Sequence, residues 1–392
     1  MMSDRIPEDE GGLAENEPSA ATPKPSPWRR ALRWLINDPA AFEPAAGSRA
    51  PAEEGSNGAC ANRVDPLRAS FFVALHLVCL LVVVVGVSKA ALVLCAILYF
   101  LRMFFITGFY HRYFSHRAFR AGRWMTWTMA ALGCTAGQRG PLWWAGHHRI
   151  HHRFSDTPDD PHSPRHRGRW FSHCLWFLSP RSFAVPTEHV RDWMRFRELR
   201  ILERIDSVPF ILLGVACALL GAWLDRAYPA LETGAGQMFV WFSISTVLVY
   251  HATYTINSLA HGFGSRRYDT PDDSRNNAWL ALITLGEGWH NNHHRYPISA
   301  RQGFRRWEID LTWLGLRALA AVGLISDLRP VPDRLLRNAD ASDHRPPEPA
   351  SPAGSSSSIG DVSGDTSGDI SAPGEQSLEK RRGSRRCECA SR

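Results

Sequence analysis

The residues of this chain that are best suited to chemistry are histidines in three short segments. Two segments share one spacing, with histidine at the first, fourth and fifth positions, and the third has two histidines five residues apart. The histidines are His148, His151 and His152, then His290, His293 and His294, and, upstream of both, His111 and His116. Residues at i, i+3 and i+4 share one face of an α-helix. Each of the first two segments is therefore expected to aim three imidazoles at one point.

Neutral imidazole is a common ligand of iron, zinc, copper and nickel. Eight imidazoles are more than one four-coordinate zinc site uses, and they suit a pair of metal ions. Scattered surface histidines would account for one such segment. Three in a single chain, two of them identical in spacing, indicate a metal site.

The third segment has a different geometry. On an ideal α-helix, residues at i and i+5 lie about 140° apart, so His111 and His116 cannot share one face. We expect this segment either to bridge two metals or to lie at an irregular helix end.

Four apolar runs determine the fold that must position these histidines. They cover residues 70–88, 90–110, 207–224 and 238–256, and each is near the roughly 20 residues that a helix needs to cross a bilayer. The sequence therefore predicts an all-α integral membrane protein, with four transmembrane helices capped by a cytosolic helical domain that holds the metal site. His76, Arg102 and His251 lie inside the runs. We interpret both histidines as structural, and the role of Arg102 stays open.

The distribution of charge predicts the orientation. The formal net charge is +7, and residues 111–206 contain 16 arginines, whereas the short links on the other side of the membrane carry little more than Lys89 and Arg226. Cytoplasmic loops are enriched in Arg and Lys, so the histidines and both termini are expected in the cytoplasm. No nucleic-acid-binding motif is visible. The eight cysteines form no C-x-x-C pair and indicate neither a zinc ribbon nor a disulfide framework.

The two ends of the chain differ from its middle. Residues 1–65 and 338–392 are rich in Pro, Ser, Gly and acidic residues, a composition typical of disorder. We expect one folded domain over residues 66–337. Cys387 and Cys389 in the tail could be lipidated, bind metal or have no structured role.

The sequence around the histidines resembles a known family. The matching stretches are Trp143-Trp144, Phe154 to Thr157, Asp160-Pro161-His162 and Gly286 to His290. Together with the three histidine segments they are similar to the membrane fatty acid desaturases, in particular the acyl-CoA Δ9 (stearoyl-CoA) branch in a bacterial type. The resemblance covers roughly residues 71–328.

That resemblance implies a cofactor and a reaction. It implies two iron ions and O2 as co-substrate, which fits the need of O2 chemistry for a redox metal. It adds His261 as a ninth imidazole and Asn257 as a ligand acting through water. The implied reaction inserts a cis double bond into a long-chain saturated acyl group. The chain shows no flavin, nicotinamide or haem motif, so a separate donor of the ferredoxin or cytochrome b5 type is expected to supply electrons.

The resemblance also implies which residues bind substrate. Gln138, Trp144 and Thr253 match positions that hold the acyl chain bent, and Tyr254 stands where the family usually has Trp. Animal acyl-CoA enzymes carry Arg-Asp where this chain has Gly146-His147, which leaves an acyl-lipid substrate in the membrane open beside acyl-CoA.

Two other function classes remain. A different membrane diiron oxygenase, such as a lipid hydroxylase, would use the same ligands. A non-enzymatic metal-binding or transport protein is disfavoured, because a transporter places its ionisable residues at mid-membrane whereas these histidines lie at the ends of the spans.

Overall fold

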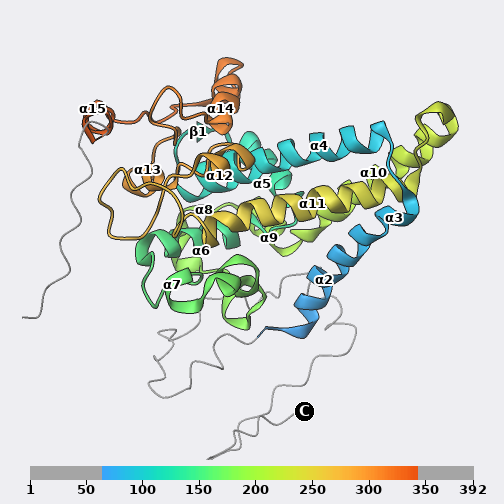
Figure 1. The fold of residues 1–392 in the computed structure, drawn as a ribbon, viewed down its shortest axis with the longest axis horizontal. Coiled ribbons are helices and arrows are strands. Elements are labelled where there is room, and N and C mark those ends of the chain that lie inside the picture. Colours follow the sequence, from blue (N-terminus) through green and yellow to red (C-terminus); the bar gives the residue numbers. More distant parts are fainter. Residues whose placement is uncertain (1–63, 343–392) are drawn as a thin grey trace, which may run out of the picture. The chain divides into compact units, whose positions relative to one another are not determined.

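The computed structural model describes residues 64–342, which are mostly helical (Figure 1). The predictions of disorder for the chain ends fall outside this range except at residues 64–65 and 338–342, and the alternatives for Cys387 and Cys389 fall entirely outside it. The α-helices are α2 (Pro66–Leu80), α3 (Val82–Val85), α4 (Lys89–Phe104), α5 (Arg123–Cys134), α6 (Pro141–Phe154), α7 (Pro164–Arg167), α8 (Arg191–Met194), α9 (Arg197–Arg204), α10 (Ser207–Ala227), α11 (Ala235–Ser258), α12 (Ala278–Ile283), α13 (His290–Arg295), α14 (Leu311–Ala321) and α15 (Asp333–Ser342). The π-helices are η3 (Phe105–Ser115) and η4 (Phe171–Leu175), and the short 3-10 turns are η5 (Trp176–Leu178), η6 (Pro180–Ser182), η7 (Thr187–His189) and η8 (Pro229–Leu231).

Four helical stretches are long and apolar enough to cross a membrane. They are Pro66–Val85, Lys89–Ser115, Ser207–Ala227 and Ala235–Ser258, and they confirm the expected multi-pass membrane fold. The first two spans begin with side-chain caps, since Asp65 accepts from the Arg68 amide at 2.9 Å and Ser88 from the Ala91 amide at 3.1 Å. Such caps satisfy backbone N–H groups that have no partner at a helix start.

Helix α11 is the centre of the span bundle and packs against α2, α4 and α10 (Figure 1). Arg102 joins α4 to α11, because its guanidinium donates to Thr246 Oγ1 at 2.7 Å and Ser245 Oγ at 2.8 Å. This is the role that the sequence left undecided. His76 of α2 and His251 of α11 also meet, Nε2 to Nε2 at 3.0 Å, so both tie spans together.

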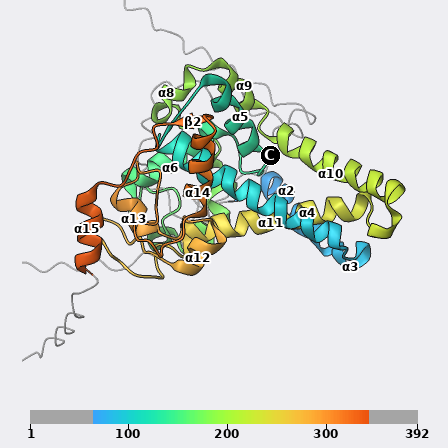
Figure 2. The same ribbon diagram turned by 90° about the horizontal axis from the view of Figure 1, so that it is seen from above.

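Because the four spans alternate in direction, residues 116–206 and 259–342 leave the bundle at the same end. There α5, α6 and α14 pack around the π-helix η3, and β1 (Arg120–Ala121) pairs antiparallel with β2 (Ile325–Ser326) (Figure 2). The core of this region is buried and apolar, with Tyr110 and Phe114 from η3, Met129 from α5 and Leu316 from α14. It holds the histidine-bearing helices against the membrane end of the bundle.

Candidate metal centre

The nine histidines singled out in the sequence come together in two adjacent groups. In each group the ring nitrogens that could bind an ion all lie within 4.8 Å of one another. The five-histidine group consists of His111, His116, His148, His152 and His293, and the four-histidine group of His151, His261, His290 and His294.

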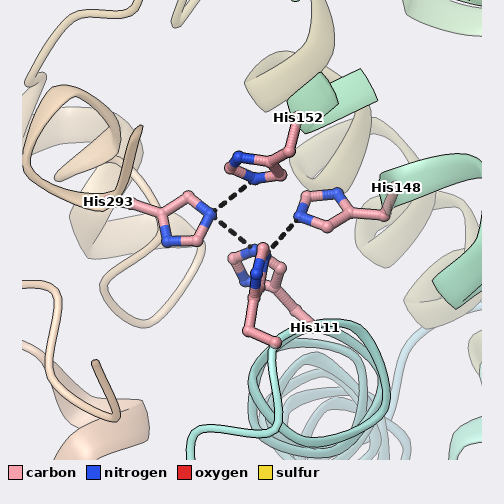
Figure 3. A group of neighbouring side chains, drawn as sticks. His111, His148, His152 and His293 are labelled. Atoms are coloured by element: carbon pink, nitrogen blue, oxygen red, sulfur yellow. Dashed lines mark hydrogen bonds between the residues drawn. The ribbon is translucent and has the colours of Figure 1, made fainter. Parts of the chain in front are cut away.

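The nitrogens of each group face inward. In the five-histidine group, His293 Nε2 lies 3.0 Å from His111 Nε2 and 2.9 Å from His152 Nε2 (Figure 3). His116 Nε2 lies 2.8 Å from His148 Nε2. In the four-histidine group, His261 Nε2 and His290 Nε2 are 3.0 Å apart. Convergence of one nitrogen from each ring on a common point is the arrangement that a metal ion requires.

Each repeated segment is divided between the two groups. His148 and His152 of α6 belong to the five-histidine group, and His151 belongs to the four-histidine group. The expectation that the three imidazoles of a segment aim at one point is therefore wrong. Residues at i and i+4 are about 40° apart on a helix, whereas i+3 and i+4 are about 100° apart, so the helix directs its two neighbouring histidines to different places.

The later segment shows the opposite division. His290 and His294 at the start of α13 belong to the four-histidine group, and His293 crosses into the five-histidine group. Each group thus receives an i, i+4 pair from one segment and a single imidazole from the other, and this exchange places the groups side by side. The ring centroids of His152 and His294 are only 4.4 Å apart.

The π-helix η3 brings His111 and His116 into the same group. A π-helix makes i→i+5 hydrogen bonds, and here the His116 amide donates to the His111 carbonyl at 3.2 Å. Residues five apart then lie about one turn apart. The expectation that these histidines cannot share a face is wrong because it assumed α-helical geometry, whereas the alternative of an irregular helix end describes the segment.

Carboxylates hold four of the nine imidazoles in place. His151 Nδ1 is 3.0 Å from Asp160, His261 Nδ1 is 2.7 Å from Asp156, His294 Nδ1 is 2.6 Å from Asp272, and His111 Nδ1 contacts Glu287. A ring that donates its Nδ1–H to a carboxylate turns the lone pair of Nε2 toward the group. The sequence analysis gave these acids no role, although three of them lie in the motifs that flank the histidine segments. Asp272 lies in none of these motifs, so nothing in the sequence predicted its contact with a histidine.

The protonation states suit a metal. Burial, and then the other histidines of the site, hold the pKa values of His148, His152, His290 and His293 well below the usual range, so these rings are neutral. Burial raises the pKa of the Asp272 carboxyl, but the hydrogen bonds from His294 and Ser274, together with the electrostatic attraction of His294, outweigh burial and the net shift is downward. His294 Nε2 is buried and, among the described residues, has no hydrogen-bond partner. A cation at the four-histidine group would satisfy it.

A cavity of about 180 Å³ reaches His148 of the five-histidine group, and its lining includes Gln138, Trp144, Thr253 and Tyr254. Gln138 Nε2 donates to Thr253 Oγ1 at 3.1 Å across its wall. A second cavity of about 40 Å³ shares part of this lining and continues to His111 and His290. The residues common to both cavities are Trp144, His148, Thr253 and Asn257. The structure therefore gathers the four residues expected at the substrate, but their role in binding it stays a prediction, as does Asn257 as a ligand through water.

His147 lies outside both groups. Its Nδ1 lies 3.0 Å from the carbonyl oxygen of Trp143, and the ring lines the larger cavity. Burial lowers the pKa of His147 to about 4, so the ring is neutral and presents Nε2 as a hydrogen-bond acceptor.

The fold and this site define a multi-pass helical membrane protein with two buried histidine groups that could hold metals. The family model described as "Fatty acid desaturase" matches residues 88–324. The chain belongs to the fatty acid desaturase family and is therefore an oxidoreductase that acts on fatty acyl groups.

Three relatives illustrate the range within the family. The sn-1 stearoyl-lipid 9-desaturase of Anabaena variabilis is 36% identical over 275 residues, covering 68% of this chain and 94% of the relative. The Delta-9 desaturase-like 4 protein of Arabidopsis thaliana is 35% identical, with 68% and 85% covered. The Acyl-CoA C20 Delta5-desaturase of Anemone leveillei is 33% identical, with 68% and 83% covered. These names differ in both the position of the double bond and the carrier of the acyl chain.

Proposed function

We propose that the protein is a Δ9 desaturase that inserts a cis double bond into long-chain saturated acyl groups, using two iron ions, O2 and an external electron donor. The observation that supports this most directly is the cavity that runs from the membrane spans to His148, with the smaller cavity continuing to His111. An acyl chain lying in it would present its methylene groups to the site where the imidazoles converge. Two relatives with a 9-desaturase or Δ9-desaturase name support the position of the double bond.

The proposed chemistry is balanced. One –CH2–CH2– unit, one O2, two electrons and two protons give one –CH=CH– unit and two waters. Bound iron would supply the activation of O2, and a set of nine imidazoles suits iron among the first-row metals. The contribution of this chain is to hold the reacting carbons near the metal centre, since C–H cleavage depends on near-contact geometry.

Cavity residues would set that geometry. The hydrogen bond between Gln138 and Thr253 fixes one wall, and the indole of Trp144 stacks on His148 with ring centroids 5.1 Å apart. Tyr254 lines the cavity beside them. An acyl chain held bent by this wall, as the family resemblance implies, would present one pair of carbons to the imidazoles.

For the carrier of the acyl chain, we favour an acyl lipid over acyl-CoA. A Cβ atom on Gly146 would lie 2.5 Å from Cγ of Pro186, so the position where animal acyl-CoA enzymes have Arg is closed by a proline ring. Its neighbour His147 is neutral and buried. The name of the Anabaena relative gives a stearoyl lipid as its substrate, which supports an acyl lipid. The name of the Anemone relative gives an acyl-CoA, so acyl-CoA is the alternative.

We further propose that the metal centre and both termini face the cytoplasm, in accord with the 16 arginines of residues 111–206. Arg165 of this region has a side chain 67% exposed. Such a basic surface could attract an acidic electron donor of the ferredoxin or cytochrome b5 type.

Expression of the full chain in a desaturase-deficient host, with fatty acids analysed by gas chromatography and mass spectrometry, tests the function. Cis-Δ9 monoenes should appear, and the His293→Ala variant should produce none. Hydroxylated products would support the lipid hydroxylase instead, and double bonds only in chains that were already unsaturated would refute the Δ9 assignment. Supplying purified enzyme and electron donor with stearoyl-CoA or with stearoyl phospholipid then decides the carrier.

A further inference from the structure

The two histidine groups differ in the negative charge placed behind their ligands. In the four-histidine group, His151, His261 and His294 each direct Nδ1 to a carboxylate. In the five-histidine group, Glu287 behind His111 is the only acid that contacts a ring, as far as the described residues show. Three acids thus support four imidazoles in one group, and one acid supports five in the other.

The charges of these acids are also compensated differently. Arg112 is buried and donates to Glu287 Oε1 from Nη2 at 3.0 Å, so part of the negative charge behind His111 is offset, and the same guanidinium also pairs with Asp310 at 2.9 Å. Within residues 64–342, the carboxylates of Asp156, Asp160 and Asp272 accept from imidazoles, backbone amides and hydroxyl groups and from no Arg or Lys side chain, whereas Arg167 Nε donates to the backbone carbonyl of Asp160 at 3.4 Å.

Backbone amides hold these three carboxylates ready for the rings. Asp156 Oδ2 accepts from the Asp273 amide at 2.8 Å as well as from His261. Asp160 Oδ2 accepts from the Asp156 amide at 3.0 Å, and Asp272 Oδ1 accepts from the Ser274 amide at 3.1 Å. Each acid is therefore fixed by the fold and does not depend on a bound ion to be placed.

A carboxylate behind a ligating imidazole increases its basicity, and loss of one such partner typically costs 10–100-fold in metal affinity. The five-histidine group has one more nitrogen, which would strengthen binding there. Three acids whose carboxylates have no Arg or Lys donor, against a single acid that shares Arg112 with Asp310, outweigh that nitrogen. From this imbalance we infer that the four-histidine group is the tighter of the two metal sites and fills first. This inference rests on the proposed function, since it assumes that both groups bind metal.

Titration of the metal-depleted, full-length protein in lipid nanodiscs with Co²⁺, without O2, tests the order of filling. Two neighbouring cations repel each other, so two binding steps would appear even for equal sites, and substitutions must assign them. Asp272→Asn and Asp156→Asn keep the shape of the acid and remove its charge. Each should weaken the first step by about 10–100-fold and leave the second within a few-fold of wild type.

Glu287→Gln is the complementary variant and should weaken the second step only. Asp192→Asn is the matched control, because Asp192 pairs with Arg117 and Arg149 and contacts none of the nine imidazoles, and it should leave both steps unchanged. The visible spectrum gives a second readout, since the first Co²⁺ should show the stronger absorption of a four-coordinate site. Melting temperatures identify any variant that fails to fold, and Asp160→Asn then replaces it.

Weakening of the first step by Glu287→Gln, or an unchanged first step in both Asp272→Asn and Asp156→Asn, would overturn the inference while leaving the desaturase proposal intact. If wild-type protein bound no metal, the proposed function itself would fail, and the two failures are thereby distinguished.

Discussion

His151 and His152 are adjacent in the chain, yet their imidazoles belong to different histidine groups. Their ring centroids are 5.5 Å apart and the ring planes meet at 74°. This divergence lets one turn of α6 supply both groups, and α13 repeats the arrangement with His293 and His294. Both groups therefore draw ligands from α6 and α13, to which the η3 segment adds His111 and His116 and the segment after α11 adds His261.

The division of α6 predicts the metal content of three neighbouring variants. Wild-type protein should carry close to two ions per chain. His151→Ala should lose the ion of the four-histidine group and His152→Ala that of the five-histidine group, so each variant should retain about one ion and lose desaturase activity. His147→Ala is the matched control and should retain two. Elemental analysis of purified protein measures this, and two ions retained in His152→Ala would contradict the assignment.

The proposed orientation can be tested by cysteine labelling in a cysteine-free background. Arg165→Cys lies at an exposed position beyond the second span, and Ala230→Cys lies in the exposed loop between the third and fourth spans. A membrane-impermeant maleimide applied to intact cells should label Ala230→Cys only. Arg165→Cys should react only after the membrane is opened. Labelling of Arg165→Cys in intact cells would reverse the orientation.

The spans were predictable because their signal is local. A run of about 20 apolar residues must be helical to cross a bilayer, whatever the rest of the chain does. Residues 207–224 and 238–256 accordingly appear inside α10 and α11. The presence of a histidine metal site was predictable for the same reason, because the spacing of histidines within each segment is visible in the sequence.

The pairing within the site was not predictable, because it depends on contacts between distant segments. Asp272 reaches His294 only because the loop before α12 folds back over α13, and no spacing rule marks it. The π-helix at His111 was hidden because periodicity arguments assume 3.6 residues per turn. The role of His261 followed from family resemblance alone, and the structure places it in the four-histidine group.

Substitution of Thr253 in the wall of the larger cavity is expected to change the position at which the double bond is inserted. Thr253→Val keeps the shape of the side chain but removes the acceptor for Gln138, so an amide donor in the wall loses its partner at a cost of about 1–3 kcal/mol. We expect double bonds at more than one position and a lower yield of the Δ9 product. Thr255→Val is the matched control, since the Thr255 hydroxyl donates only to the Ala252 carbonyl of its own helix in the described contacts. Mass spectrometry of derivatised monoenes locates the double bonds, and an unchanged Δ9 share in Thr253→Val would argue against this role.

The loop before α13 packs closely against α12 at Gly288, and we expect this packing to be needed for His290 to reach the four-histidine group. A Cβ atom on Gly288 would lie 2.0 Å from the Ala281 nitrogen and 2.4 Å from the Asn277 carbonyl oxygen. Both are backbone atoms of the α12 region, so the loop itself must move in Gly288→Ala, and overpacking of this kind typically costs about 1–3 kcal/mol. Because α13 begins only two residues later, the shift should carry His290 away from the four-histidine group and lower both the melting temperature and the metal content.

The matched control for this prediction is Gly122→Ala. Gly122 has an ordinary backbone conformation with φ of −67°, and a Cβ atom there would meet nothing within 4 Å. Gly122 is the N-cap of α5 and makes no side-chain hydrogen bond there, so Ala should cost no more than about 1 kcal/mol. The melting temperature of Gly122→Ala should therefore be close to that of the wild type, and the variant should bind two ions per chain. If Gly288→Ala behaved in the same way in thermal melting and elemental analysis, the close approach of its loop to α12 would have no part in holding His290.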